Sequence, residues 1–359
     1  MNEGNGDEIA QKTLARLVVE EITGQPFEKA SATIGPLAIN YFSFVFTVKT
    51  QTSRGPQNVF VKIPKEDLRK GSKSILPITS ADRRMAKDEE NSLCALAEQW
   101  QSGDLGVSWV RLRSVYPQYN AIVTDRVQGA DAIAVFRRLD LRRRLGFSND
   151  RARLRDAMAR FGEALGRFHQ RSAQGTVFRV KETLPKLDRY CHDLGSIIGT
   201  RLPAHVMRVL KSIADLEIEA TEVPTLKGID IRNVLMDEQD KLFLLDPGRM
   251  KRTCREADLA RFLMTYRILY WGSWLFLLGL RPDIQAEEAF LDAYYSKTAP
   301  RSQKLLSYFL IKEQLKHWHT AIDSLRLLAW AMPIKRLIEA TYINPYYTRQ
   351  LAQELKKVI

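Results

Sequence analysis

The sequence contains few cysteines and few histidines. Cys94, Cys191 and Cys254 are widely spaced among 359 residues, and an odd, sparse set excludes a disulfide framework. No CxxC motif or Cys/His cluster has the spacing of a zinc site, and the five histidines have no metal spacing either. The polar, acidic stretch of residues 1–12 lacks the features of a signal peptide. These absences favour a reducing cytoplasm as the compartment.

Long apolar runs are also scarce. One run, residues 262–280, approaches the length that is needed to span a bilayer. Arg267 lies inside it, and Gly272 and Ser273 interrupt it. Because a charge within a membrane span is costly, we expect this run to be a buried helix of a large helical domain.

The charge is strongly unbalanced. Hydrophobic residues make up 45% and charged residues 27% of the chain, which is typical of a globular protein, but the net charge is +13. Such a surface favours anionic partners, namely phosphorylated substrates, nucleic acid or acidic lipid headgroups. The length suits two packed lobes rather than one small core.

Hydrophobic periodicity changes along the chain. Alternating apolar residues in 41–50 and the following stretch 59–63 predict a pair of strands, and residues 120–127 predict one more buried strand. Residues 153–172 carry apolar side chains at steps of three and four, which predicts an amphipathic helix. Strands early and helices late indicate an α+β fold, with a small β-rich lobe over residues 1–125 and a helical lobe over 126–359.

Two oxygen-bearing side chains flank a predicted hairpin at residues 234–246. Asp246 ends an apolar strand and is followed by Pro247 and Gly248, and Asn233 lies thirteen positions earlier. A carboxylate delivered by a rigid strand and a nearby amide oxygen would suit Mg²⁺. The alternative is that both are ordinary turn residues.

The N-terminal strands supply a lysine. Lys62 lies on a strand among inward-pointing apolar residues and needs an anionic partner there. We expect Glu90, on the helix predicted for residues 80–100, to fix Lys62 over the α- and β-phosphates of a nucleotide. Gly35 precedes the first strand pair, where its loop would let backbone N–H groups approach phosphates.

The order of these parts resembles the aminoglycoside phosphotransferase and choline kinase group of the protein-kinase-like superfamily, with the lipopolysaccharide sugar kinases as a related comparison. The resemblance covers roughly residues 10–300. It rests on six stretches in the expected order: GPLAINYFSFVFTV, FVKI, IVTDRVQGAD, LGRFHQRS, NVLMDEQDKLFLLDPGR and EADLARFL. It implies a bilobal kinase-like fold, ATP and Mg²⁺ as cofactors, Asp125 at a nucleotide-binding hinge, and Asn233 and Asp246 as metal ligands.

The catalytic loop departs from this family. The family pattern is His-x-Asp-x-x-x-x-Asn, but counting back from Asn233 places Leu226 and Gly228 at the histidine and base positions. Asp230 stands two residues after Gly228, and side chains at i and i+2 of an extended loop point the same way. Asp230 is therefore the candidate for orienting or deprotonating the acceptor.

Three interpretations remain open. In the first, Asp230 is a displaced base and the protein is an active kinase. In the second, the base is lost while Lys62, Asn233 and Asp246 still bind nucleotide, as in a pseudokinase with a regulatory role. In the third, the chain is a basic scaffold that binds a membrane or nucleic acid.

The acceptor is suggested only by charge. Eight arginines lie between Arg137 and Arg155, and arginine pairs with phosphate and carboxylate groups. This predicts a saccharide-containing or phosphorylated small-molecule acceptor, lipid-linked as one alternative. Peripheral contact with the anionic inner face of a membrane is a further alternative. Nucleic acid is disfavoured, because no aromatic-glycine RNA motif accompanies the basic run.

Overall fold

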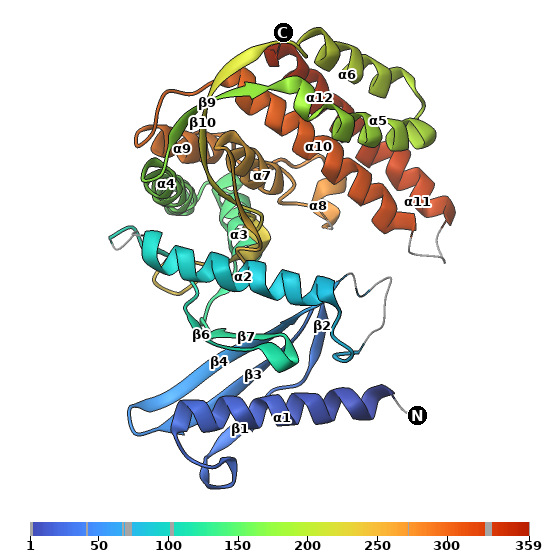
Figure 1. The fold of residues 1–359 in the computed structure, drawn as a ribbon. Helices are drawn as coiled ribbons and strands as arrows, with labels where there is room; N and C mark the ends of the chain where they lie inside the picture. The colour runs from blue at the N-terminus through green and yellow to red at the C-terminus, as the bar shows by residue number, and fades with distance from the viewer. Residues whose placement is uncertain are drawn as a thin grey trace. The chain divides into compact units, whose positions relative to one another are not determined.

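The computed structural model describes residues 3–40, 42–66, 68, 74–100, 104–271, 273–326 and 332–358. They divide into two compact units (Figure 1). The N-terminal unit comprises Met1–Ala130, Leu226–Gly228 and Asn233–Met250, and the helical unit comprises Asp131–Thr225, Ile229–Arg232 and Lys251–Ile359. The stretch 226–250 therefore contributes to both units.

An antiparallel sheet forms the centre of the N-terminal unit. Its strand order is β1-β3-β4-β7-β6, with β2 added to β3. The strands are β1 (Ala32–Ile34), β2 (Ala38–Asn40), β3 (Ser43–Thr52), β4 (Gly55–Pro64), β6 (Leu112–Tyr116) and β7 (Ala121–Asp125). The strand pair predicted around residues 41–63 is thus confirmed, and Lys62 of β4 lies opposite Val45 of β3 and Ile122 of β7.

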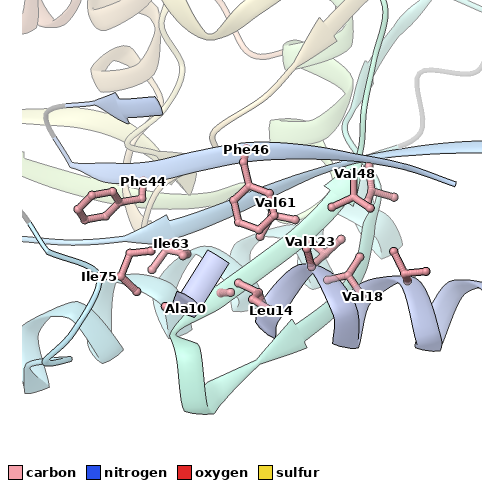
Figure 2. Close-up of a cluster of buried hydrophobic side chains, with 14 of the residues drawn as sticks. Ala10, Leu14, Val18, Phe44, Phe46, Val48, Val61, Ile63, Ile75 and Val123 are labelled. Atoms are coloured by element: carbon pink, nitrogen blue, oxygen red, sulfur yellow. The ribbon is translucent and has the colours of Figure 1, made fainter. Parts of the chain in front are cut away.

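Helices cover both faces of this sheet, α1 (Glu3–Thr23) on one side and α2 (Ser80–Gln99) on the other (Figure 1). Figure 2 shows Leu14 and Val18 of α1 packed against Val61 and Val123 of the sheet, all of them buried. Ile122 instead packs into a separate cluster with Leu93 of α2. Because neighbouring residues of a strand point to opposite faces, the alternation that marks these strands also supplies two separate cores.

A second, smaller sheet lies around the predicted hairpin. Strands β11 (Val234–Met236) and β12 (Leu242–Leu244) pair antiparallel, which confirms the hairpin. Strand β5 (Val107–Trp109) pairs parallel with β12. At the other edge, β8 (Ala130–Asp131) marks the point where the chain passes into the helical unit.

The helical unit contains a three-stranded sheet and most of the helices. The sheet order is β13-β10-β9, formed by β9 (Gln174–Arg179), β10 (Glu217–Leu226) and β13 (Met250–Cys254). The helices are α3 (Ala132–Arg144), α4 (Ser148–Gln170), α5 (Leu184–Ile198), α6 (Arg201–Ser212), α7 (Glu256–Arg267), α8 (Trp274–Leu277), α9 (Ile284–Tyr295), α10 (Gln303–Arg326), α11 (Met332–Ile338) and α12 (Asn344–Val358). The α+β class predicted from the sequence is confirmed.

The amphipathic pattern of α4 forms the core of this unit. Its predicted apolar stripe is buried throughout, as the fractional exposures of its members show: Leu154 0%, Met158 0%, Phe161 2%, Leu165 0% and Phe168 2%. Phe161 packs against Phe262 of α7 with ring centroids 4.4 Å apart. Spacing of three and four therefore identified the buried face correctly.

The apolar run 262–280 was predicted to be one buried helix, and this is only half right. Helix α7 ends at Arg267, whose guanidinium is ion-paired with Glu287 and Glu354. The short α8 follows, with Trp274 and Leu278 largely exposed. Hydropathy alone does not distinguish these two halves, because it carries no information about which residues find packing partners. Among the described residues, no helix is both long enough and apolar enough to cross a membrane.

Candidate functional site

Lys62 is aimed by the alternation of β4. Val59, Val61 and Ile63 point into the core beneath α1, so Lys62 projects from the opposite face, where α2 lies. Burying an ammonium is costly unless carboxylates compensate it. The side chain of Lys62 is 16% exposed, and two carboxylates surround its amine.

The first of these carboxylates belongs to Glu89. Lys62 Nζ donates to both oxygens of Glu89, at 2.9 and 2.8 Å. The prediction that Glu90 holds Lys62 is therefore wrong, since Glu90 pairs with Lys87 instead, at 3.0 Å. Leu93 and Leu96 are buried on α2, and Glu89 precedes them by four and seven residues. This spacing places Glu89 on the buried face of the helix, and it is a signal that the sequence already contained.

Asp246 supplies the second carboxylate. Its Oδ2 lies 2.8 Å from Lys62 Nζ, and its Oδ1 accepts the N–H of Gly248 at 3.1 Å. Gly248 has a φ of +59°, which the turn after Asp246 requires and glycine adopts without strain. Helix α2 also holds the end of this segment, because Ser92 Oγ accepts the N–H of Met250 at 3.0 Å. The same helix thus fixes Lys62 and the chain that carries Asp246.

The three groups shift one another's protonation. Burial lowers the pKa of Lys62, but Asp246 and Glu89 outweigh it and raise that pKa. Burial raises the pKa of Glu89 to about 7, against the attraction of Lys62, and the neighbouring Asp246 charge adds to the rise. Burial also acts on Asp246, but Lys62 prevails and lowers its pKa. The site therefore combines a permanent cation, a permanent carboxylate and one carboxylate that titrates near neutrality.

The amide of Asn233 is oriented toward the same place by backbone groups. Its Nδ2 donates to the carbonyl of Gly228 at 3.1 Å and to that of Asp246 at 3.4 Å. Because both bonds use the nitrogen, the amide oxygen is turned away from those carbonyls and is left as an oriented acceptor. Asn233 and Asp246 are thus in contact within the N-terminal unit, and their roles as metal ligands stay predictions.

The donor set fits a hard, partly hydrated cation. Carboxylate and amide oxygens suit Mg²⁺, which usually keeps several waters and takes further oxygens from phosphates. In the described part of the chain, no three His, Cys, Asp or Glu side chains gather into a group that would hold a metal alone. A site built from one carboxylate, one amide and a ligand's own oxygens agrees with this finding.

Gly228 occupies the position of the missing base for a steric reason. A Cβ at this residue would lie 1.6 Å from the carbonyl oxygen of Asp246. The backbone here runs beside the 246–249 turn: Gly228 N–H donates to Pro247 O at 2.8 Å, and Lys227 N–H donates to Arg249 O at 3.1 Å. In this loop conformation no side chain fits at residue 228.

Asp230 belongs to the helical unit and lies in a tight local turn. Its Oδ1 accepts the backbone N–H of Arg232 at 2.9 Å, and both of its oxygens accept from the Arg232 guanidinium. Hydrogen bonding to Asp230 raises the pKa of Arg232. The side chain of Asp230 is 9% exposed, whereas that of Arg232 is 57% exposed. A carboxylate so occupied is a poor base, but it holds a guanidinium at the surface.

Gly35 and Asp125 make their described contacts elsewhere in the N-terminal unit. The N–H of Gly35 donates to Thr47 O at 2.8 Å, and a Cβ at Gly35 would lie 2.5 Å from Thr47 Oγ1. Packing against β3 thus explains this glycine without a phosphate. Asp125 ends β7 and is ion-paired with Arg113. Their nucleotide-binding roles stay predictions.

Comparison with known proteins identifies the fold. The sequence matches no protein-family model and no curated protein. Among solved structures, the chain is similar to choline kinase from Cryptosporidium parvum, with 10% identity, a TM-score of 0.56, and 96% of this chain and 95% of that chain covered. It is also similar to a Ralstonia eutropha protein assigned as an aminoglycoside phosphotransferase, with 13% identity, a TM-score of 0.55 and 98% of each chain covered.

A third similar structure is a macrolide 2'-phosphotransferase from Brachybacterium faecium, with 12% identity, a TM-score of 0.50, and 93% of this chain and 98% of that chain covered. These likenesses extend over nearly the whole chain. The chain therefore has the kinase-like fold of the choline kinase and aminoglycoside phosphotransferase structures, which confirms the fold that the six sequence stretches predicted.

Proposed function

We propose that the protein is an ATP- and Mg²⁺-dependent phosphotransferase that acts on a hydroxyl of a saccharide-containing small molecule. The observation that carries the proposal is the convergence of Lys62, Glu89 and Asp246, which come from a strand, a helix and a post-strand turn of one unit. Phosphoryl transfer depends mainly on placing positive charge around phosphates. The Lys62 amine supplies one positive charge, and the oxygens of Asp246 and Asn233 would hold a metal ion as another.

Each residue has a distinct task in this proposal. Glu89 holds the Lys62 amine in place, and Lys62 exchanges its second partner, Asp246, for a nucleotide phosphate. Asp246 and Asn233 would hold Mg²⁺ through oxygen atoms. When bound, the metal and ATP supply the transferable phosphoryl group and neutralise the charge that develops on it. The 43% exposure of the Asp246 side chain leaves its carboxylate accessible to such a ligand.

Asp230 and Arg232 act on the acceptor side. The ion pair that occupies Asp230 favours an orienting role over strong proton abstraction, because a loose phosphoryl-transfer transition state demands little base catalysis. Arg232 would pair with an anionic group of the acceptor, since its guanidinium is exposed while Asp230 is buried beneath it.

The test measures nucleotide binding and turnover separately. Mg²⁺ with ATP should raise the melting temperature of the wild type, and Lys62→Ala should remove most of this shift. Asp230→Asn should keep the shift and lose about 10²-fold in transfer of labelled phosphate to a panel of sugars and saccharide lipids. Wild-type transfer to none of these acceptors, with the nucleotide shift intact, would remove the catalytic part of the proposal.

One observation favours a second candidate, a nucleotide-binding pseudokinase with a regulatory role. The contact of Gly228 with the Asp246 carbonyl excludes a side chain from the position where the related family carries its base. Under this alternative the nucleotide shift persists, and slow ATP hydrolysis is absent or is unchanged by Asp230→Asn. Failure of Mg²⁺ and ATP to shift the melting temperature at all would contradict both candidates and favour a binding scaffold.

A further inference from the structure

The helical unit carries a surface formed by two segments that are distant in sequence. These are the α3–α4 connection, around residues 144–151, and the start of α9, around residues 281–285. Arg144 donates to the carbonyl of Arg281, and Arg151 donates to the side chain of Gln285. Asp283 is also ion-paired with Arg155 at 3.3 Å. These contacts hold the two segments side by side.

Large apolar side chains protrude from this surface. Leu145 is 77% exposed and Phe147 is 49% exposed on the first segment, and Ile284 is 69% exposed on the second. We call these three residues the apolar tip. Single exposed apolar residues scattered over a surface need no explanation. Three large apolar side chains on two segments that hydrogen bonds hold together form an exposed apolar patch, and such patches often mark a binding surface.

Arginines flank Leu145 and Phe147 in the sequence, and the Arg142 guanidinium lies 4.7 Å from the ring centroid of Phe147. Residues 137–155 contain eight arginines and two aspartates, so this short stretch carries a net charge of +6 out of the +13 of the whole chain. The two aspartates are already paired, Asp140 with Arg143 at 2.8 Å and Asp150 with Arg142 at 2.7 Å. Asp283 of the second segment pairs with Arg155 at 3.3 Å and with Arg143 at 3.7 Å, but Arg281 balances its charge, so the two segments together keep the net charge of +6.

We propose that this surface docks the protein onto an anionic membrane. Apolar side chains that enter the boundary between headgroups and acyl chains, flanked by arginines that pair with lipid phosphates, are the two features that interfacial binding requires. Arginine suits this role because its stem lies along apolar material while its guanidinium pairs with phosphate. The inference is independent of the proposed catalytic residues, and it would bring the protein to lipid-linked acceptors.

Charge and side-chain type argue against two other occupants. A second copy of the chain related by two-fold symmetry would bring the arginines of both copies together, and like charges repel. Nucleic acid would satisfy the arginines, but single strands bind through several aromatic platforms, and in the apolar tip only Phe147 is aromatic. An acidic lipid surface matches the charged and the apolar parts together.

The experiment is sedimentation of the full chain with vesicles of phosphatidylcholine alone and with vesicles that also contain phosphatidylglycerol. The variant is the double substitution Leu145→Ser with Phe147→Ser, at two exposed positions where folding should be unaffected. The matched control is Ile334→Ser with Leu337→Ser on α11, which removes two similarly exposed apolar side chains, 58% and 63% exposed, from another helix. A melting curve of each variant confirms that it is folded.

The expected result is binding to the anionic vesicles alone, which weakens at least tenfold between about 50 mM and about 500 mM salt. The tip variant should bind at least tenfold more weakly than the wild type, and the α11 control should bind as the wild type does. The proposal is overturned by an absence of sedimentation, by equal binding to neutral vesicles, or by equal weakening in the control. It is also overturned if the tip variant instead loses RNA binding or self-association while vesicle binding persists.

Discussion

Asp246 and Asp230 lie sixteen residues apart in one stretch of chain, and their surroundings differ in kind. Asp246 shares a lysine with Glu89 and keeps 43% of its side chain exposed, whereas Asp230 is 9% exposed and is ion-paired with Arg232. The first carboxylate is held by groups from distant elements, and the second by its own neighbour. The position of the Asp246 carboxylate therefore depends on the fold of the whole N-terminal unit, whereas that of Asp230 depends on its local turn.

This contrast matches the two roles that we propose for these residues, nucleotide binding and acceptor orientation. A carboxylate positioned by β4, α2 and a turn is preorganised and open to a ligand, which is what a metal site requires. Asp230, by contrast, is engaged in a local ion pair and holds the exposed guanidinium of Arg232 in position. In the proposed function, the first carboxylate serves the nucleotide and its metal, and the second presents Arg232 to the acceptor.

The largest expected effect follows from removing the charge of the first carboxylate. Asp246→Asn leaves Lys62 held by Glu89 but takes away the anionic ligand for Mg²⁺. We expect the Mg²⁺-dependent part of the ATP-induced shift to disappear and phosphate transfer to fall about 10²–10³-fold. Asp240→Asn, at the tip of the same hairpin, is the control. If Mg²⁺ with ATP raised the melting temperature of Asp246→Asn and of the wild type equally, Asp246 would not be a metal ligand.

The next effect concerns the loop between the two carboxylates. Gly228→Ala would place a Cβ 1.6 Å from the Asp246 carbonyl, so the 246–249 turn must move. We expect a loss of about 3 kcal/mol in the free energy of unfolding in urea. Gly175→Ala is the matched control, since a Cβ there meets nothing within 4 Å, and it should change stability by less than about 0.5 kcal/mol. A similar stability for both variants would show that the loop relaxes freely.

Two adjacent glutamates provide a sharper test of the amine. Glu89→Ala removes a partner of Lys62, and we expect ATP affinity to fall about tenfold, or ~1.4 kcal/mol. Glu90→Ala breaks only the contact with Lys87 and should leave ATP affinity within about twofold of the wild type. Isothermal titration with Mg²⁺ and an ATP analogue measures the affinity of both variants. A larger loss in Glu90→Ala than in Glu89→Ala would show that Glu90 is the residue that positions Lys62.

The last prediction is a pH dependence of stability. Folding raises the pKa of Glu89 from 4.5 to about 7, so between these values the folded protein binds a proton that the unfolded chain releases. This contribution is fully present below pH 4.5 and is lost as the pH rises through about 7. Relative to Glu89→Gln, which cannot titrate, the wild type should lose roughly 3 kcal/mol across this window. Parallel pH profiles in urea unfolding would contradict the assignment.

Periodicity predicted much of the fold and one part of the site. The alternation in β3, β4 and β7 identified the sheet, and the stripe from Leu154 to Phe168 identified the central helix α4. It also placed Lys62 opposite the side that packs beneath α1. These predictions succeeded because burial of one face imposes a fixed period on the sequence.

Other features depended on contacts between distant residues. A carboxylate partner for Lys62 was expected, but the choice between Glu89 and Glu90 depended on the rotation of α2 about its axis. The helical spacing from Leu93 and Leu96 carried that information and favoured Glu89. No local pattern could show that Gly228 presses against the Asp246 carbonyl, since that contact joins residues eighteen positions apart. The division of run 262–280 into a buried and an exposed half likewise required the packed structure.

The sequence by itself determined the order of strands and helices, the sites where a lysine and two oxygen ligands would be delivered, and the excess of positive charge. These follow from local periodicity, from turn chemistry and from counting residues. Only the tertiary structure decided why residue 228 is a glycine and which apolar side chains stay exposed beside arginines. Such outcomes depend on how elements far apart in the chain pack, and steric exclusion at a contact has no period along the sequence.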